Sequence, residues 1–129
     1  MSDDERGSRT QLVLVAHGSR ATTANDAHRA VAARLAERLG ATVRSAFLEL
    51  AEPSIGDAID DAVAAGAPQV VVLPHFLYPG RHVGEDIPAI VAEAADRHPG
   101  ATIELARPSG DDPAMVELLV ELARRALDG

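Results

Sequence analysis

The chain has 129 residues, a net charge of -8 and no cysteine. This length suits one domain with a sizeable core, and the missing thiols exclude cysteine nucleophiles, disulfide frameworks and thiolate zinc sites. The acidic balance argues against general affinity for nucleic acid or anionic membranes, and no stretch approaches the roughly 20 apolar residues of a membrane span.

Short β-branched runs alternate with helical patterns after a charged leader at residues 1–9, which we expect to be disordered. The predicted order is strand 11–16, helix 23–39, strand 43–49, a helix from Pro53 to Gly66, strand 69–73, a loop over 75–85, helix 86–97, strand 102–105 and a helix with Asp112 as N-cap and Pro113 at its first position. Such alternation is typical of βαβ units around a parallel sheet. We therefore predict a cytoplasmic, single-domain α/β protein over residues 10–129, a three-layer sandwich with a central four-stranded parallel sheet.

The first predicted strand-to-helix turn carries the sequence Ala-His-Gly-Ser-Arg at residues 16–20. It lies at the carboxyl end of a strand, the edge where open parallel sheets bind ligands. Glycine permits a sharp turn, and the N–H groups at the start of the next helix favour an anion. His17 is therefore a candidate metal ligand or base, and Ser19 and Arg20 are candidates for holding a carboxylate or phosphate. The alternative is an ordinary tight turn with a hydrogen-bonded histidine.

Glu49 closes the second predicted strand as an acidic residue in an otherwise apolar run. A carboxylate there is costly unless it is paired, solvated or bound to a metal. Glu52, just before Pro53, has a simpler explanation, because an acidic residue is favourable near a helix N-terminus. We therefore prefer Glu49 to Glu52 as the functional carboxylate.

The predicted loop after the third strand combines histidines with aromatic residues in its sequence from 74 to 88. His75 and His82 join His17 as candidate ligands, and Arg81 is a candidate for binding acidic groups. The only aromatic residues of the chain all lie next to these candidates: Phe47, Phe76 and Tyr78. Such a loop indicates a bound apolar ligand or a partner subunit, whereas the alternative is a loop folded over its own core.

Two further histidines have simpler explanations, and Arg107 has two alternatives. His28 lies within the first predicted helix, and His98 lies at a helix end, where a positive charge complements the helix dipole. Arg107 follows the fourth predicted strand, where it either reaches the functional edge or is a solvated loop residue.

Together these motifs resemble the short class II tetrapyrrole chelatases, the CbiX-type sirohydrochlorin cobaltochelatases and their iron-inserting relatives. The resemblance runs from about Leu12 to the end of the chain. Its matching elements are His17-Gly18-Ser19-Arg20, Phe47-Leu48-Glu49 with Pro53, and Pro74-x-Phe76-Leu77-x-x-Gly80-x-His82 with Asp86-Ile87-Pro88.

This resemblance implies a chelatase-like, flavodoxin-related fold and insertion of a divalent metal, Co²⁺ or Fe²⁺, into sirohydrochlorin. It implies His17 and His82 as metal-site histidines and Glu49 as their acidic partner, with His75 as a neighbouring group or an extra base. It further implies a homodimer, because longer relatives fuse two such halves. No tightly bound cofactor is expected, since the metal is a substrate.

Insertion requires a macrocycle to lose its pyrrole N–H protons, which imidazole and carboxylate groups can accept at neutral pH. Arg20 and Arg81 would then orient the acidic side chains of the tetrapyrrole, and Phe76 and Tyr78 would pack against its ring. Besides a purely structural flavodoxin-like module, in which His17→Ala and His82→Ala would leave metal affinity unchanged, two functional alternatives stay open. One is a metal or tetrapyrrole carrier that never catalyses insertion. The other is a histidine phosphatase-like hydrolase, which is disfavoured because Ala16 replaces the arginine that precedes the histidine in that class.

Overall fold

Four parallel strands form a single sheet in the order β2-β1-β3-β4. They are β1 (Gln11–Ala16), β2 (Thr42–Phe47), β3 (Gln69–Pro74) and β4 (Thr102–Leu105). The computed structural model describes residues 9–129, except for the side chain of His82, so the predicted leader up to residue 8 lies outside the described residues. The predicted four-stranded parallel α/β fold is confirmed.

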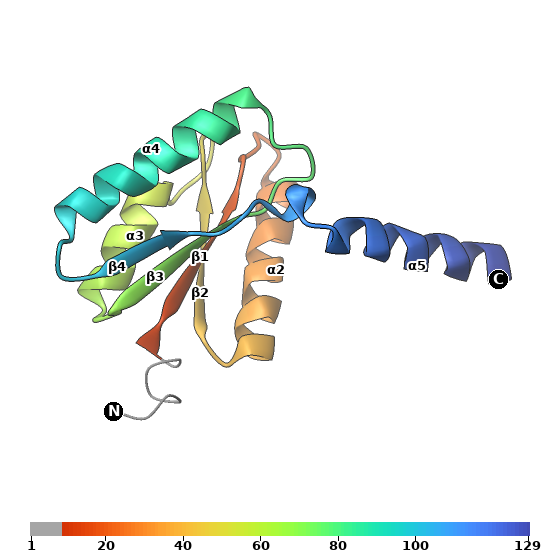
Figure 1. Cartoon of the computed structure of the whole chain (residues 1–129), viewed down its shortest axis with the longest axis horizontal. Coiled ribbons are helices and arrows are strands. Elements are labelled where there is room, and N and C mark those ends of the chain that lie inside the picture. The colour runs from red at the N-terminus through yellow and green to blue at the C-terminus, as the bar shows by residue number, and fades with distance from the viewer. Residues whose placement is uncertain (1–8) are drawn as a thin grey trace.

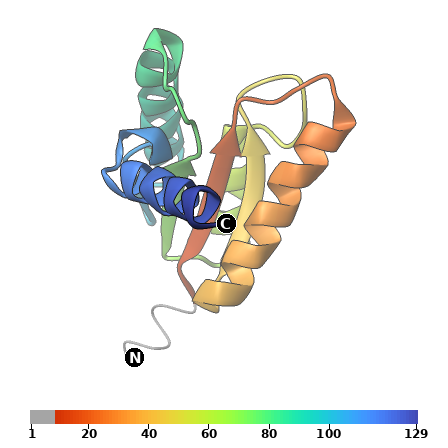
Figure 2. The same cartoon turned by 90° about the vertical axis from the view of Figure 1, so that its right-hand side faces the viewer.

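Three of the helices cover the two faces of this sheet (Figures 1 and 2). On one face are α3 (Ile55–Ala64) and α4 (Arg81–Arg97), and on the other is α2 (Thr22–Leu39). A short 3-10 helix, η1 (Ser109–Asp111), leads into α5 (Ala114–Asp128), which projects away from the sheet. In the described part of the chain, no helix is long and apolar enough to cross a membrane.

The main core lies between the sheet and the pair α3 and α4. Val13, Val15, Val70 and Val72 alternate along β1 and β3 and are fully buried against apolar side chains of these helices. Side chains at every second position of a strand share one face, so these valines form a continuous apolar layer. This layer fixes the strands whose carboxyl ends carry the candidate residues.

Helix α4 begins at Arg81, five residues earlier than the sequence predicted, and Pro88 lies inside it rather than in its first turn. Glycine and proline favour loops locally, which is why residues 81–85 were predicted as loop. However, Val83 and Ile87 are buried in the core, and packing of this kind outweighs local propensity. The predicted loop is therefore shorter and His82 belongs to a helix.

Smaller boundary errors have local causes. Helix α3 begins at Ile55, because Ser54 rather than a residue near Pro53 caps it: its side chain accepts a hydrogen bond from the backbone N–H of Asp57 at 3.2 Å. Helix α5 begins at Ala114, whose N–H donates to the Asp112 side chain at 2.8 Å. Strand β2 ends at Phe47, so Glu49 lies in the loop beyond it.

Candidate functional site

The loops that follow β1 and β2 run side by side because hydrogen bonding continues beyond both strands. Leu48 donates its N–H to the carbonyl of Ala16 at 2.9 Å, and Glu49 donates to the carbonyl of His17 at 3.0 Å. These two bonds place the side chains of His17 and Glu49 next to each other. His17 Nε2 and Glu49 Oε1 are 2.8 Å apart.

Gly18 is required for this approach of the two loops. Its φ of 99° lies in the region that favours glycine, and a Cβ added there would meet the carbonyl oxygen of Glu49 at 1.7 Å. Both the backbone angle and the contact therefore exclude a side chain at this position. The glycine of the His-Gly-Ser motif is explained by the closeness of the Glu49 loop.

Asn25 holds the other side of the same turn. It is buried in α2, accepts a hydrogen bond from the N–H of Ser19 at 3.0 Å and donates to the carbonyl of Ser19 at 2.7 Å. The hydroxyl of Ser19 accepts the N–H of Ala21 at 3.0 Å. Asn25 was not predicted from the sequence, although a polar residue on the sheet-facing side of a helix is a usable signal.

The His17–Glu49 pair combines fixed geometry with access from solvent. Its side chains are 54% and 58% exposed. If the N–H at Nε2 of His17 donates to Glu49, the lone pair of Nδ1 is left to bind a metal or accept a proton. A histidine oriented by a carboxylate in this manner is typical of metal sites.

The loop after β3 contacts this pair through Phe76. The ring of Phe76 lies edge-on to the His17 ring, with centroids 6.4 Å apart and an interplanar angle of 79°. In the neighbouring residue His75, the Nδ1 atom lies 2.9 Å from Ser109 Oγ. The Ser109 hydroxyl donates a hydrogen bond to the carbonyl of Phe76 at 3.3 Å. Ser109 was also missed from sequence, although its position after β4 at the functional edge was a usable signal.

His28 and His98 each have a hydrogen-bond partner outside the His17–Glu49 pair. The His28 ring is buried, bonds the carbonyl of Leu14 at 2.9 Å and stacks on His75 at 6.5 Å. Burial lowers the pKa of His28, although the Leu14 carbonyl opposes the shift. His98 bonds Asp60 at 2.6 Å, and this bond lowers the pKa of Asp60.

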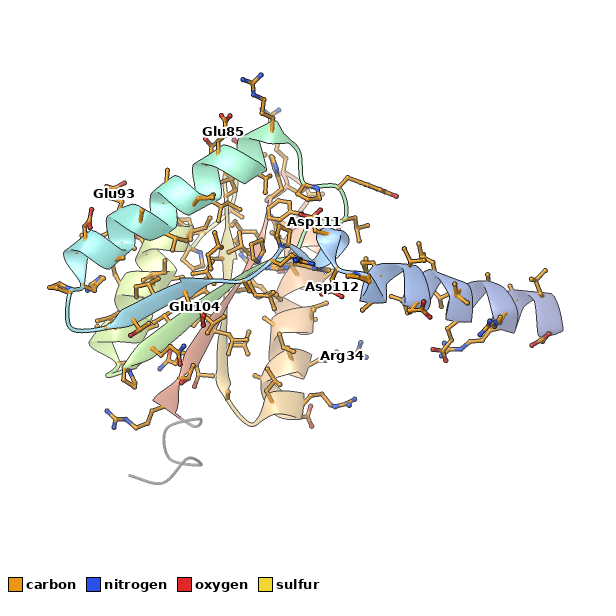
Figure 3. The ribbon with its side chains drawn as sticks, in the orientation of Figure 1. Arg34, Glu85, Glu93, Glu104, Asp111 and Asp112 are labelled. Carbon is orange, nitrogen blue, oxygen red and sulfur yellow. The ribbon has the colours of Figure 1, made fainter. Side chains whose placement is uncertain are left out.

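Several predicted residues do not join the pair. Tyr78 is 92% exposed. The exposed side chain of Arg81 lies 3.5 Å from the carboxylate of Glu85. The side chain of Glu85 points away from the sheet (Figure 3). Arg20 and Arg107 are also exposed. The predicted ligand His82 lies in the first turn of α4, but its side chain is outside the described residues. Among the described residues, no group of three His, Asp or Glu side chains gathers to hold a metal ion.

Comparison with known proteins gives consistent matches. The family model for CbiX matches residues 11–126. The chain is 36% identical over 117 residues to the chloroplastic sirohydrochlorin ferrochelatase of Arabidopsis thaliana, which covers 90% of this chain and 52% of that protein. It is 30% identical to the sirohydrochlorin cobaltochelatase of Methanopyrus kandleri, over 90% of this chain and 96% of that one.

A solved structure shares the fold. The crystal structure of the sirohydrochlorin chelatase SirB from Bacillus subtilis subspecies spizizenii, in complex with cobalt, matches with a TM-score of 0.73 and 29% identity. The match covers 90% of this chain and 50% of that one. The chain thus spans about half or less of the length of several curated relatives, while it spans nearly all of others.

Proposed function

Because the chain belongs to the CbiX family, we propose that it inserts a divalent metal ion into a sirohydrochlorin-type tetrapyrrole. The observation that carries this proposal is the exposed pair His17 and Glu49, 2.8 Å apart at the carboxyl edge of the sheet. The names of similar proteins, a ferrochelatase and a cobaltochelatase of sirohydrochlorin, give it further support.

Proton removal is the first demand of the reaction, because a pyrrole nitrogen that carries hydrogen has no lone pair for the metal. Two N–H protons leave the macrocycle as one divalent ion enters. We assign Glu49 as the group that accepts these protons in turn, since a carboxylate acts as a base at neutral pH, while the free nitrogen of His17 is kept for the metal. The exposure of the Glu49 side chain then lets the protons pass on to water.

Metal delivery is the second demand. We assign His17, His82 and Glu49 to the transient metal site, with His75 as an extra base or a group that orients the site. Nitrogen and oxygen ligands suit both Co²⁺ and Fe²⁺, so the ligand types do not distinguish cobalt from iron. The metal is a substrate in this scheme, and no resident cofactor is required.

The tetrapyrrole itself needs contacts with its ring and with its acidic side chains. Phe76 lies beside His17 and is positioned to pack against the ring. Ser19, Arg20, Tyr78 and Arg81 extend along the same edge of the sheet and are assigned to the acidic groups and the rim of the ring. We further propose that residues 10–129 act as one chelatase domain, in the cytoplasm and as a homodimer in which a second copy supplies another wall for the flat substrate.

The test measures metal insertion under anaerobic conditions. Purified protein is mixed with excess sirohydrochlorin and either Co²⁺ or Fe²⁺, and the tetrapyrrole absorbance is followed against a protein-free control. Replacing Glu49→Gln should lower kcat about 100-fold, the lower end of what a positioned proton acceptor contributes. Glu52→Gln is the matched control, because it removes a carboxylate from the same loop without touching the pair, and its rate should stay unchanged.

Each outcome separates one alternative. Several turnovers per site, lost in Glu49→Gln but kept in Glu52→Gln, support the chelatase. One metallated product per site indicates a carrier. A rate equal to the protein-free control rejects insertion chemistry, and phosphate release from an aryl phosphate would instead favour a hydrolase.

A further inference from the structure

The short helix η1 holds the start of the loop after β3, although the two segments are far apart in sequence. Gly110 donates its N–H to the carbonyl of Phe76 at 2.8 Å, and the hydroxyl of Ser109 donates to the same carbonyl at 3.3 Å. A carbonyl oxygen has two lone pairs, so it accepts both bonds. In Figure 1, η1 is the short blue helix just before α5. Two donors on one carbonyl fix the backbone that carries the Phe76 ring.

Gly110 is required because the two segments touch through their backbones. A Cβ added to Gly110 would overlap the carbonyl groups of Phe76 and Leu77. The φ of Gly110 is not positive, so the contact alone excludes a side chain. Strand pairing brings the segments together, because Ala106, beyond the end of β4, still donates its N–H to the carbonyl of Val72 at 2.8 Å. The position of η1 therefore follows from the sheet.

His75 contacts the same hydroxyl, and this contact defines which ring nitrogen carries hydrogen. Nδ1 of His75 lies 2.9 Å from Ser109 Oγ. The hydroxyl has a single hydrogen, and the bond to the Phe76 carbonyl uses it. Both contacts are hydrogen bonds only if Nδ1 of His75 carries hydrogen and donates it to Oγ. In the neutral ring, Nε2 then holds the lone pair.

The segment that η1 holds lies between the candidate pair and α2. The Phe76 ring is partly buried against the core and lies edge-on to His17. The His75 ring stacks on His28 of α2. Farther along the same loop, the side chain of Tyr78 is exposed. The bonds from η1 thus act on Phe76 and not on the tip of the loop.

We propose that Ser109 and Gly110 are positioning residues for the tetrapyrrole, because they set the place of the Phe76 ring beside His17. Stacking between flat rings depends on their offset and spacing, so an aromatic side chain helps most when it is already in place. A preorganised ring also avoids the cost of being ordered when the substrate binds. The inference rests on the proposed function and extends it to a segment that need not touch the substrate.

The first test separates positioning from simple support of the fold. Ser109→Ala removes the bonds to Phe76 and His75. It should raise the KM for sirohydrochlorin about threefold to tenfold and change kcat by less than about twofold, because ring packing contributes equally to the bound substrate and the transition state. Ser109→Thr keeps the hydroxyl and should restore the wild-type KM. Gly110→Ala should raise KM further, since it pushes the loop away from η1.

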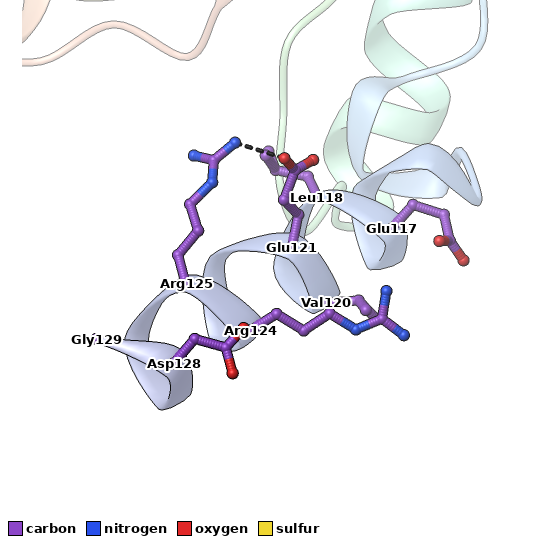
Figure 4. A pocket seen from close by; sticks show the side chains of 8 residues that line it. All are labelled: Glu117, Leu118, Val120, Glu121, Arg124, Arg125, Asp128 and Gly129. Atoms are coloured by element: carbon purple, nitrogen blue, oxygen red, sulfur yellow. Dashed lines mark hydrogen bonds and ion pairs between the residues drawn. The ribbon is translucent and has the colours of Figure 1, made fainter.

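Two controls match these changes. Glu121→Ala also removes a hydrogen-bond acceptor after β4, since Glu121 pairs with Arg125 at 2.6 Å on the exposed side of α5 (Figure 4). Gly100→Ala adds a methyl group just before β4, at the opposite edge of the sheet, where no atom lies within 4 Å of the new Cβ. Both variants should keep the wild-type KM and kcat.

The second test needs neither metal nor substrate. Nitrogen NMR of the histidine rings at about pH 8, where a histidine of ordinary pKa is neutral, should show hydrogen on Nδ1 of His75 in wild type and in Ser109→Thr. In Ser109→Ala, both neutral forms of the ring should be populated. Hydrogen exchange at the amide of Gly110 should become about tenfold faster in Ser109→Ala, because the loop opens more often when one of its bonds is lost.

Three results would overturn the proposal. One is a wild-type KM in Ser109→Ala. Another is a fall in kcat with KM unchanged, which would place Ser109 in the chemical step. The third is hydrogen on Nε2 of His75 in wild type, because the hydroxyl would then donate to His75 and leave the Phe76 carbonyl. The two Ser109 variants decide the test even where Gly110→Ala does not fold.

Failure of the proposed function gives a different pattern. A wild type that inserts no metal refutes the proposed function, and the role of η1 toward the substrate falls with it. The NMR and exchange results still decide whether η1 holds the loop. An active wild type with an unchanged KM in Ser109→Ala refutes only the positioning role.

Discussion

The turn after β1 and the loop after β3 both reach the candidate site, but they are held very differently. The first is fixed on both sides, by the bonds of the Glu49 loop and by buried Asn25. The second is held near its root, where Gly110 donates its N–H to the carbonyl of Phe76 at 2.8 Å, while the side chains of Leu77 and Tyr78 are exposed. The proposed chemical pair is thus set in advance, and the residues proposed for the bulky substrate are free to adapt.

The strongest way to break this comparison is to separate the two loops at Gly18. Gly18→Ala should lower the free energy of unfolding by about 4 kcal/mol or more, because the new Cβ collides with the Glu49 carbonyl in addition to the unfavourable φ. Gly66→Ala is a close control: its φ of 98° nearly equals the 99° of Gly18, but no atom lies within 4 Å of its added Cβ. It should cost only about 1–2 kcal/mol.

Urea denaturation of both variants measures the difference. Equal losses for Gly18→Ala and Gly66→Ala would show that the close approach of the Glu49 loop contributes nothing to stability. In that case the turn would be no more rigid than the loop after β3.

Features of the fold and the site that depend on residues close in sequence could be predicted, and features that depend on residues far apart could not. The strands were predictable because runs such as Val70 to Leu73 are apolar and β-branched, a local signal that the core reinforces. The start of α4 was not, since Gly80 and Gly84 indicate a loop locally and only the burial of Val83 and Ile87 makes a helix. His17 and Glu49 could be proposed individually from their positions at strand ends.

Their contact could not be predicted with the same strength. It requires β1 and β2 to be neighbours in the sheet, and strand order depends on packing across the whole chain. Ser109 was missed for a related reason, because it holds the backbone of Phe76, which is far from it in sequence. Asn25 holds Ser19 within the same strand-to-helix unit, and its role becomes visible only once the turn is folded. Parallel sheets bring such residues together only after the strands are assembled.

A smaller effect is expected when the turn loses its side-chain support. Asn25→Ala removes both hydrogen bonds to Ser19 and leaves the backbone N–H and carbonyl of Ser19 partly buried without these partners. The free energy of unfolding should therefore fall by about 2 kcal/mol. The insertion rate should fall as well, because the turn carries His17. Asp26→Ala, at the neighbouring exposed position with its surface ion pair to Arg29, should cost less than about 0.5 kcal/mol.

Stability curves and insertion rates of the two variants check this together. A stable Asn25→Ala protein with full activity would contradict the view that the turn is held from α2. Loss of stability with an unchanged rate would show that Asn25 supports the fold but does not position His17.

A pH dependence of stability should report on the contact between α2 and the start of the loop after β3, where His28 stacks on His75. The pKa of His28 is lowered in the folded protein, first by burial and further by the nearby charges of His75 and Arg29. Below the ordinary histidine pKa of about 6.5, the unfolded chain therefore binds more protons at this residue. The contribution of His28 to stability should be constant above that pH and should fall as the pH drops below it.

Replacing His28→Gln should flatten this slope, because glutamine keeps a donor for the Leu14 carbonyl without titrating. Denaturation at several values between pH 5 and pH 8 measures it. A slope that is identical in the variant would assign the acid sensitivity to other groups.

The smallest effect on stability is expected at the tip of the open loop. Tyr78 is 92% exposed, so Tyr78→Ala should change the free energy of unfolding by less than about 0.5 kcal/mol. If the ring packs on the bound tetrapyrrole, the lost contact of about 0.5–1.5 kcal/mol should raise KM by about twofold to tenfold with little change in kcat. The measurement is the KM for sirohydrochlorin at saturating metal, with Val31→Ala, an exposed apolar position on α2, as a control that should leave it unchanged. An unaltered KM in Tyr78→Ala would remove this residue from the substrate site and leave Phe76 as the aromatic contact. A fall in kcat alone would mean that the tip of the loop acts on the chemical step. The division between a fixed turn and an adaptable loop would then no longer hold.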